Sequence, residues 1–195
     1  HAYERLASAL GTAGSMLPLS KELSALRAVK DGSELACMRT AALIASEALL
    51  GLLPDLRPGL EEREIALELD VRMRRAGAEE ISFPTIVASG RHAALPHATP
   101  GFRRLEAGDA VVIDYGAVFL GYHSDETCTF FLGQPDDEVR AVYEQVLRAH
   151  DLALASLKPG VACRDVDRIA RDTLREAGLE RYFTHGTGHG VGLDV

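Results

Sequence analysis

The sequence has little of what several protein classes require. Its three cysteines, Cys37, Cys128 and Cys163, are widely spaced and odd in number, which argues against a disulfide framework and indicates reduced thiols in a cytoplasmic protein. Positive charge is in deficit: the net charge is -8, which disfavours nucleic acid and anionic membranes as partners. No signal peptide is recognisable, and no apolar run approaches the ~18 residues of a membrane span.

Two common catalytic patterns are missing as well. Neither Ser89 nor Ser124 has a plausible His–Asp arrangement, so a serine nucleophile is not expected. The glycine-rich stretch 186–192 lacks a Gly-Lys-Ser/Thr sequence and a preceding βαβ pattern, so it does not resemble a phosphate-binding loop. Any catalytic chemistry is therefore expected from other side chains.

What is present is an ordinary globular composition, 47% apolar and 26% charged, in a chain long enough for one domain with a substantial core. We expect residues 1–19 to be a linker or the remnant of an N-terminal domain, and residues 20–195 to form one domain that is incomplete at its C-terminal end. Periodicity and capping residues predict helices at 20–29, 31–53, 61–76, 137–154 and 164–177, and strands at 83–89, within 109–131 and at 182–193.

An internal repeat relates two parts of the chain. Residues 56–79 align without a gap with residues 157–180, at a constant offset of 101, and both copies begin with Leu-x-Pro-Gly and end with Ala-Gly-x-Glu. A long helix precedes each copy and a strand is expected after each, which predicts a duplicated helix–helix–strand–hairpin unit. At this offset the second hairpin would carry its acidic residues near 215 and 226, beyond Val195.

Two carboxylates in the predicted hairpin form a candidate metal site. Asp114 ends a β-branched run and Asp125 precedes a second strand; if the turn lies between Phe119 and Leu120, the two face each other. Directly opposed side chains are about 4.5–5.5 Å apart, and carboxylates that close repel unless a proton or a cation lies between them. Oxygen ligands of this kind suit Mn²⁺, Co²⁺, Fe²⁺ or Mg²⁺. The alternative, a solvated outer face, fits the mixed polar and apolar character less well.

Three histidines are candidates to join these carboxylates. His189 lies among the glycines of 186–192, and the repeat places this stretch beside the strand at 83–88; the alternative is a glycine-rich turn with an incidental histidine. His185, four residues earlier, would share its face on a strand, and His97 lies in a long polar loop. Such histidines donate a hydrogen bond to a developing oxyanion or move a proton. The alternative for both is a surface position.

Taken in order, four motifs resemble those of one family. They are Pro96-His97, Gly108-Asp-Ala-Val-Val-Ile-Asp114-Tyr-Gly116, Gly121-Tyr-His-Ser-Asp125-Glu-Thr-Cys-Thr-Phe130 and His185-Gly-Thr-Gly-His189-Gly-Val-Gly-Leu193. With the leader at 22–31, they resemble the pita-bread metallopeptidases, which include prolidase (Xaa-Pro dipeptidase), aminopeptidase P and methionine aminopeptidase. The resemblance implies an α+β pita-bread (creatinase/aminopeptidase) fold, in which helices cover a curved antiparallel sheet with a pseudo-twofold internal repeat.

The resemblance also implies roles for the candidate residues. Asp114 and Asp125 resemble the family's metal-bridging carboxylates and His189 its imidazole ligand, while His97 and His185 resemble its catalytic and substrate-binding histidines. It implies two divalent metal ions, with Mn²⁺ expected and Co²⁺, Zn²⁺ or Fe²⁺ as alternatives, and hydrolysis of the bond before proline by a metal-activated water. The partner would be an Xaa-Pro dipeptide, or a peptide with proline in second position, and the protein would be a homodimer.

The sequence departs from the family pattern in two ways. Two further glutamate ligands of the family have no counterpart in these 195 residues, so we expect three of five ligands and no activity from this chain alone, and Cys128 stands where the family commonly has arginine. The leader favours the prolidase and aminopeptidase P branch over methionine aminopeptidase, and the metal ligands argue against metal-free, creatinase-like hydrolysis. Dipeptidase and aminopeptidase both stay open. The alternative from another class is a relative that binds peptides or proteins without catalysis.

Overall fold

The computed structural model describes residues 2–11, 17 and 19–195. Helices alternate with short antiparallel strands along the chain, so the predicted α+β class is confirmed. Of the residues predicted as a linker, positions 1, 12–16 and 18 lie outside the described residues. Helix α1 spans Ala2–Leu10.

The helices of the first repeat begin and end close to their predicted positions. They are α2 (Ser20–Ala28), α3 (Gly32–Leu52) and α4 (Glu62–Arg75), with the 3-10 turn η1 (Leu53–Asp55) after α3. Either Asp31 or Ser33 could cap α3, and the structure shows Asp31 in this position: its carboxylate accepts from the N–H groups of Ser33 (2.8 Å) and Glu34 (2.9 Å). The Glu34 side chain accepts from the Asp31 N–H (2.7 Å), which completes a capping box.

Two three-stranded antiparallel sheets are built from one long hairpin and two single strands. Their strand orders are β2-β3-β6 and β1-β4-β5. The strands are β1 (Glu80–Ile81), β2 (Ile86–Ser89), β3 (Ala110–Tyr115), β4 (Ala117–Phe119), β5 (Tyr122–His123) and β6 (Glu126–Phe131). The 3-10 turn η2 (Gly90–Ala94) begins the long loop between β2 and β3.

The hairpin passes from one sheet to the other at Gly116 and Ser124. A Cβ atom on Gly116 would lie 2.0 Å from the carbonyl oxygen of Ser124, so no larger residue fits there without a backbone shift. Ser124 is buried; its Oγ accepts from the Ala117 N–H (3.0 Å) and its own N–H donates to the Ala117 carbonyl (2.9 Å). This contact fixes where the next residue, Asp125, leaves the hairpin.

One face of the β2-β3-β6 sheet forms the core with α3 and α4. Val111, Ile113 and Tyr115 of β3 point to this face and are at most 1% exposed, whereas Val112 and Asp114 point to the opposite face. The helices contribute buried Ile44, Ala45, Ala48, Leu49, Leu52, Ile65, Ala66, Leu69 and Met73. The face that carries Asp114 is not part of this core.

Helix α3 is long and apolar enough to be tested as a membrane span. An 18-residue window within Gly32–Asp55 has a mean hydropathy of 1.5, so this helix meets the criteria of length and composition, which the absence of an uninterrupted apolar run did not lead us to expect. A third of that window is buried, and Ala45 and Leu49 within it pack in the core formed with α4 and the β2-β3-β6 sheet.

The second copy of the repeat forms α5 (Asp137–Ser156), α6 (Cys163–Glu176) and the 3-10 turn η3 (Glu180–Tyr182). Its helix α6 begins and ends 101 residues after α4. The glycines after these helices, Gly77 (φ +108°) and Gly178 (φ +73°), adopt the same left-handed conformation. The helical part of the predicted repeat is therefore confirmed.

The predicted strand at 182–193 is wrong. Tyr182 ends η3, and residues 183–195 are irregular. A strand needs a partner strand, and none of the described residues pairs with this segment as β3 pairs with β2. Other contacts hold the segment instead. Among them, the His123 N–H donates to the Gly192 carbonyl (2.8 Å), and Arg27 pairs with Asp194 (2.6 Å).

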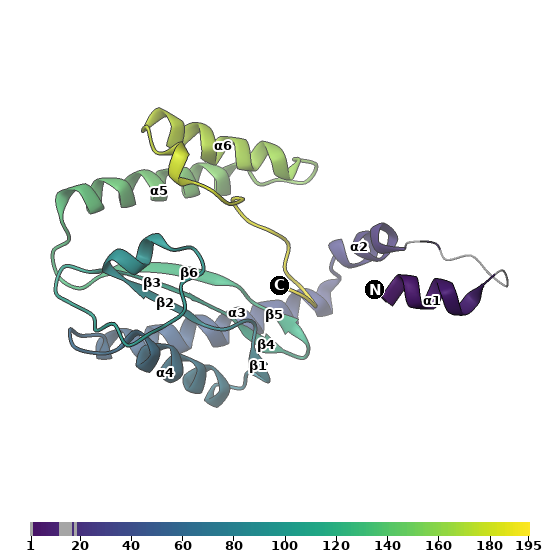
Figure 1. The fold of residues 1–195 in the computed structure, drawn as a ribbon, viewed down its shortest axis with the longest axis horizontal. Coiled ribbons are helices and arrows are strands. Elements are labelled where there is room, and N and C mark those ends of the chain that lie inside the picture. Colours follow the sequence, from purple (N-terminus) through teal and green to yellow (C-terminus); the bar gives the residue numbers. More distant parts are fainter. Residues whose placement is uncertain (1, 12–16, 18) are drawn as a thin grey trace.

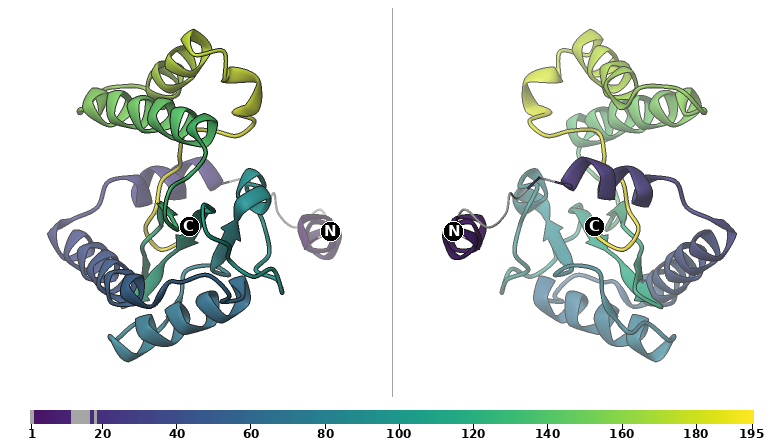
Figure 2. Two further views of the ribbon diagram at one scale, coloured as in Figure 1. Left: turned by 90° about the vertical axis from the view of Figure 1, so that its left-hand side faces the viewer. Right: turned by 90° about the vertical axis from the view of Figure 1, so that its right-hand side faces the viewer.

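The sheets lie between two helical layers. Figure 1 shows α3 and α4 on one side of the sheets and α5 and α6 on the other, and the two views in Figure 2 agree. The C-terminal segment descends from α6 toward the edge of the sheets near β5 (Figure 1). It therefore passes the sheet face that carries Asp114.

Candidate metal centre

Four of the five predicted site residues line one hollow of about 420 Å³. Asp114 ends β3, Asp125 precedes β6, His97 lies in the loop after η2 and His189 lies in the C-terminal segment. The remaining lining residues are Phe83, Pro84, Thr85, Ile86, Ala98, Thr99, Pro100 and Val195. The fold thus gathers these four side chains, from separate stretches of the sequence, at the face of the β2-β3-β6 sheet opposite α3 and α4.

Asp114 has a different strand partner from the one predicted. It pairs with Thr127 of β6, whose hydroxyl donates to the Asp114 carboxylate (3.0 Å), and not with Asp125. The predicted turn was one residue too early: Phe119 pairs with Tyr122, and the two loop residues between them have positive φ. Asp125 therefore reaches the hollow from the end of the strand, and the carboxylates are not directly opposed.

Asp125 is paired with His189. The His189 Nε2 atom lies 3.1 Å from the Asp125 carboxylate, and the two side chains are 58% and 26% exposed. An ion pair this exposed contributes little to stability. Its significance is positional, because it brings an imidazole from the C-terminal segment against a carboxylate of the hairpin.

The electrostatics of the hollow favour a cation. Burial is the main cause that raises the pKa of Asp114, and repulsion from Asp125 raises it further, while the Thr127 hydrogen bond and the charges of His97 and His189 lower it. A divalent cation would relieve that repulsion.

Two carboxylates and an imidazole are donors that Mn²⁺, Co²⁺, Zn²⁺ and Fe²⁺ accept. Over residues 2–11, 17 and 19–195, however, no three His, Cys, Asp or Glu side chains are close enough together to hold a metal ion. The chemical types of these side chains suit a metal ion, whereas the distances between them are larger than the ligands of one bound ion require.

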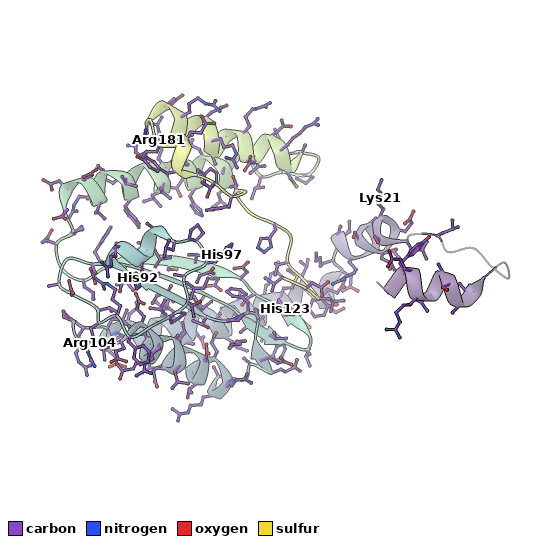
Figure 3. All side chains as sticks on the ribbon, in the orientation of Figure 1. Lys21, His92, His97, Arg104, His123 and Arg181 are labelled. Atoms are coloured by element: carbon purple, nitrogen blue, oxygen red, sulfur yellow. The ribbon has the colours of Figure 1, made fainter. Side chains whose placement is uncertain are left out.

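His97 and His185 lie in different surroundings. Figure 3 shows His97 on the side of the sheet that faces the C-terminal segment, where it lines the hollow. His185 is exposed and does not line it. The His185 ring packs edge-on against Phe183 (4.9 Å between centroids), and its carbonyl accepts from Arg171 of α6 (2.6 Å). The face shared by His185 and His189 on a strand is absent because the strand is absent.

Sequence reasoning missed the residues that support the hollow. Thr85, which lines it, is buried and donates its hydroxyl to Asp70 of α4, whose pKa is raised by burial. Gly116 and Ser124 set the position of Asp125. Only the glycine carried a signal, since it interrupts a strand pattern, and such a glycine often marks a close backbone approach.

Comparisons with known proteins identify the family of the chain. Residues 36–195 match metallopeptidase family M24. The Xaa-Pro dipeptidase of Pyrococcus horikoshii is 41% identical over 170 residues, which cover 87% of this chain and 48% of that protein. The uncharacterized peptidase YqhT of Bacillus subtilis is 38% identical over 188 residues, which cover 96% of this chain and 53% of that protein.

Solved structures agree with this assignment. The X-Pro aminopeptidase from Thermotoga maritima superimposes with a TM-score of 0.93 at 39% identity, covering 100% of this chain and 54% of that one. Prolidase from Pyrococcus furiosus gives a TM-score of 0.87 at 39% identity, covering 90% and 52%. The chain spans about half the length of these relatives, and the predicted pita-bread fold is confirmed. The chain belongs to metallopeptidase family M24.

Proposed function

We propose that the chain is part of a metal-dependent peptidase that hydrolyses the bond before proline. The observation that carries the proposal is the convergence of Asp114, Asp125, His189 and His97 on one hollow. The names of the relatives, Xaa-Pro dipeptidase and X-Pro aminopeptidase, support the same substrate class.

In this proposal Asp114, Asp125 and His189 hold divalent metal, with Mn²⁺ expected. Bound metal would supply Lewis-acid polarisation of the scissile carbonyl and a lower pKa for a water. In the same proposal His97, which lines the hollow, donates a hydrogen bond to the carbonyl oxygen of the substrate. His185 would need to move with the C-terminal segment to reach the substrate. A homodimer remains a prediction.

The lining of the hollow suits an apolar residue next to the scissile bond. Phe83, Pro84, Ile86 and Pro100 present apolar surface beside the carboxylates. A proline ring has no N–H to satisfy, so an apolar wall can accept it without leaving a polar group unpaired. This supports an Xaa-Pro dipeptide, or a peptide with proline in second position, as the substrate.

The proposal is tested by hydrolysis of Ala-Pro by the full-length protein in Mn²⁺. Losing a ligand should cost more than the 10–100-fold typical of an outer-shell partner, so we expect Asp114→Asn and Asp125→Asn to lower kcat/KM by at least about 100-fold. Asp137→Asn, at the exposed start of α5, is the matched control. Unchanged hydrolysis by Asp114→Asn would contradict the proposed ligand set.

A second assay separates the two peptidase types. Cleavage of Ala-Pro in preference to Ala-Pro-Ala identifies a dipeptidase, and the reverse preference identifies an aminopeptidase P.

The second candidate function is peptide binding without catalysis. One observation favours it: within the part of the chain that the structure describes, no three potential ligands are grouped closely enough for a metal ion. It predicts that proline peptides bind with and without Mn²⁺ and are not cleaved. Isothermal titration with Ala-Pro, in Mn²⁺ and in chelator, distinguishes it from the peptidase.

A further inference from the structure

Glu62 is a fully buried carboxylate outside the proposed ligand set. It is 0% exposed and occupies the first position of α4. A negative charge is favoured at a helix N-terminus, but a buried carboxylate is costly unless hydrogen bonds satisfy it. The donors that satisfy Glu62 therefore indicate what this residue holds in place.

Those donors lie at both ends of one loop. At the start of the loop, Oε1 of Glu62 accepts from the Ser89 N–H and hydroxyl, both at 2.8 Å. The His92 Nδ1 atom lies 3.2 Å from each carboxylate oxygen. At the end of the loop, the Gly101 N–H donates to Oε2 at 3.3 Å. One carboxylate thus joins residues 89 and 101, which are twelve positions apart.

The first turn of α4 adds backbone bonds to the same loop end. The Arg63 N–H donates to the Gly101 carbonyl (3.2 Å) and the Glu62 N–H to the Arg103 carbonyl (3.0 Å). These are helix N-terminal N–H groups without a partner in their own helix. Arg103 connects the end of the loop to its start: its guanidinium donates to the Ser89 hydroxyl (2.6 Å) and forms an ion pair with Asp109 (2.7 Å). Both loop ends are therefore tied to α4 and to each other.

Between these two ends the loop forms one wall of the hollow. His97, Ala98, Thr99 and Pro100 all line it. Figure 3 shows His92, a Glu62 partner, and His97 on the same side of the sheet. We infer that Glu62 is a positioning residue that places His97 over the metal ligands by fixing both ends of this loop. The inference rests on the proposed function, because only that function gives His97 a substrate to bind.

Two further observations agree with this role. Burial raises the pKa of Glu62, but the hydrogen bonds from Ser89, His92 and Gly101 together outweigh it and leave the pKa below its ordinary value, so the group accepts as a carboxylate at neutral pH. The repeat also places the exposed Cys163 where the first copy has Glu62. The carboxylate is thus a feature of the copy that carries His97, and the helix forms without it.

The first experiment needs no catalysis. Glu62→Gln keeps the size of the side chain and removes its charge. The matched control is Glu64→Gln, an exposed carboxylate in the same helical turn whose single capping hydrogen bond from the Glu61 N–H a glutamine oxygen can also accept. We expect the Ser89 and Gly101 amides to exchange at least about tenfold faster in Glu62→Gln, because glutamine offers one neutral acceptor oxygen in place of two charged ones and so cannot accept equally from both amides. We also expect the His97 ring signals to shift in NMR spectra. Unchanged exchange and unchanged His97 signals would overturn the inference.

A milder variant covers the case in which Glu62→Gln fails to fold. His92→Ala removes one partner from a partly exposed position. We expect the same direction of change, smaller in size, at Ser89 and His97. No change at either position would overturn the inference.

The second experiment is a double-mutant cycle on hydrolysis by the full-length protein. A displacement of about 1 Å costs roughly 100-fold in rate, so Glu62→Gln should lower kcat/KM by about 100-fold with His97 present. In a His97→Ala background we expect less than about threefold further loss, because residues that act through each other are not additive. Additive losses would show a general structural role and overturn the inference. Absence of hydrolysis in the wild type would contradict the proposed function, and the exchange experiment would still decide the role of Glu62.

Discussion

Helices α4 and α6 begin and end at equivalent positions of the repeat, yet they lie in different surroundings. Helix α4 packs with α3 against the β2-β3-β6 sheet, and its Leu69 and Met73 are 0% exposed. Helix α6 packs mainly against α5, in a separate small cluster of Ala149, Ala153, Ala170 and Leu174. In the second copy α5 leaves Val142, Val146 and Leu154 between 41% and 57% exposed.

The comparison of α4 with α6 distinguishes what determines the ends of a helix from what determines the burial of its apolar side chains. Both copies share the Pro-Gly before the helix and the Ala-Gly after it, and the two helices begin and end at equivalent positions although their surroundings differ. Burial of the apolar stripe depends on a sheet to cover it, and in the second copy no such sheet is present among the described residues.

The largest expected effect is on core packing. Met73→Ala should cost ~2–5 kcal/mol of unfolding free energy, and Leu174→Ala, at the equivalent position of the second copy, should cost an amount near ~2 kcal/mol, because a small cluster collapses more easily around the lost atoms. Urea unfolding followed by far-UV circular dichroism measures both. Leu67→Ala, at a 65% exposed position of α4, is the control. A larger loss of unfolding free energy in Leu174→Ala than in Met73→Ala would contradict the proposed difference in packing between the two copies.

The next effect concerns acid stability. The pKa of Glu62 is lower in the folded state than in the unfolded chain, so its contribution is fully present above the unfolded value and is lost as pH falls through the folded value. Wild type should therefore exceed Glu62→Gln by ~1.5–3 kcal/mol at pH 7, and the gap should shrink below about pH 4. Urea midpoints between pH 7 and pH 3 measure the gap. A gap that widens in acid would contradict this sign.

A smaller, equal effect is expected at the two turn glycines. Gly59 (φ +94°) and Gly160 (φ +88°) are equivalent in the repeat, and an added Cβ would meet no atom within 4 Å at either position. Alanine should therefore cost ~1–2 kcal/mol at each, from backbone conformation alone. Thermal unfolding of Gly59→Ala and Gly160→Ala measures this. Clearly unequal costs would mean that the copies differ in local structure as well.

The smallest effect is chemical and leaves stability unchanged. Cys163 is exposed at the start of α6, while Cys128 is partly buried in the first copy. Burial, and then the charge of Glu126, raises the pKa of the Cys128 thiol, which slows its reaction with alkylating agents. Mass spectrometry after brief maleimide treatment should find Cys163 labelled before Cys128. Cys163→Ser should remove the fast-reacting site, and fast labelling of Cys128 would contradict its burial.

The errors in the turn position and in the strand at 182–193 have a local and a tertiary cause, respectively. The turn was placed one residue too early because Leu120 adopts φ +49°, a conformation that bulky side chains rarely take. With Gly121 at φ +76° it forms the two-residue loop that sets the register of both β3–β6 and β4–β5. The strand at 182–193 was expected from composition, but a strand exists only where a partner supplies its hydrogen bonds.

The residue types and their order determined much about this protein. Capping residues and glycines gave the helix ends, the offset of 101 gave the repeat, and acidic residues in a β run indicated Asp114 and Asp125. Each of these signals is carried by residues close together in the chain, and local propensity acts at that range.

Only the tertiary structure decided which of the candidate residues meet. It brought His97 and His189 to the carboxylates and left His185 outside the hollow. It also gave Glu62 its role, since the donors to that carboxylate lie 27 to 39 residues further along the chain. The physical reason is that burial and hydrogen-bond partners depend on distant segments, which local sequence patterns do not specify.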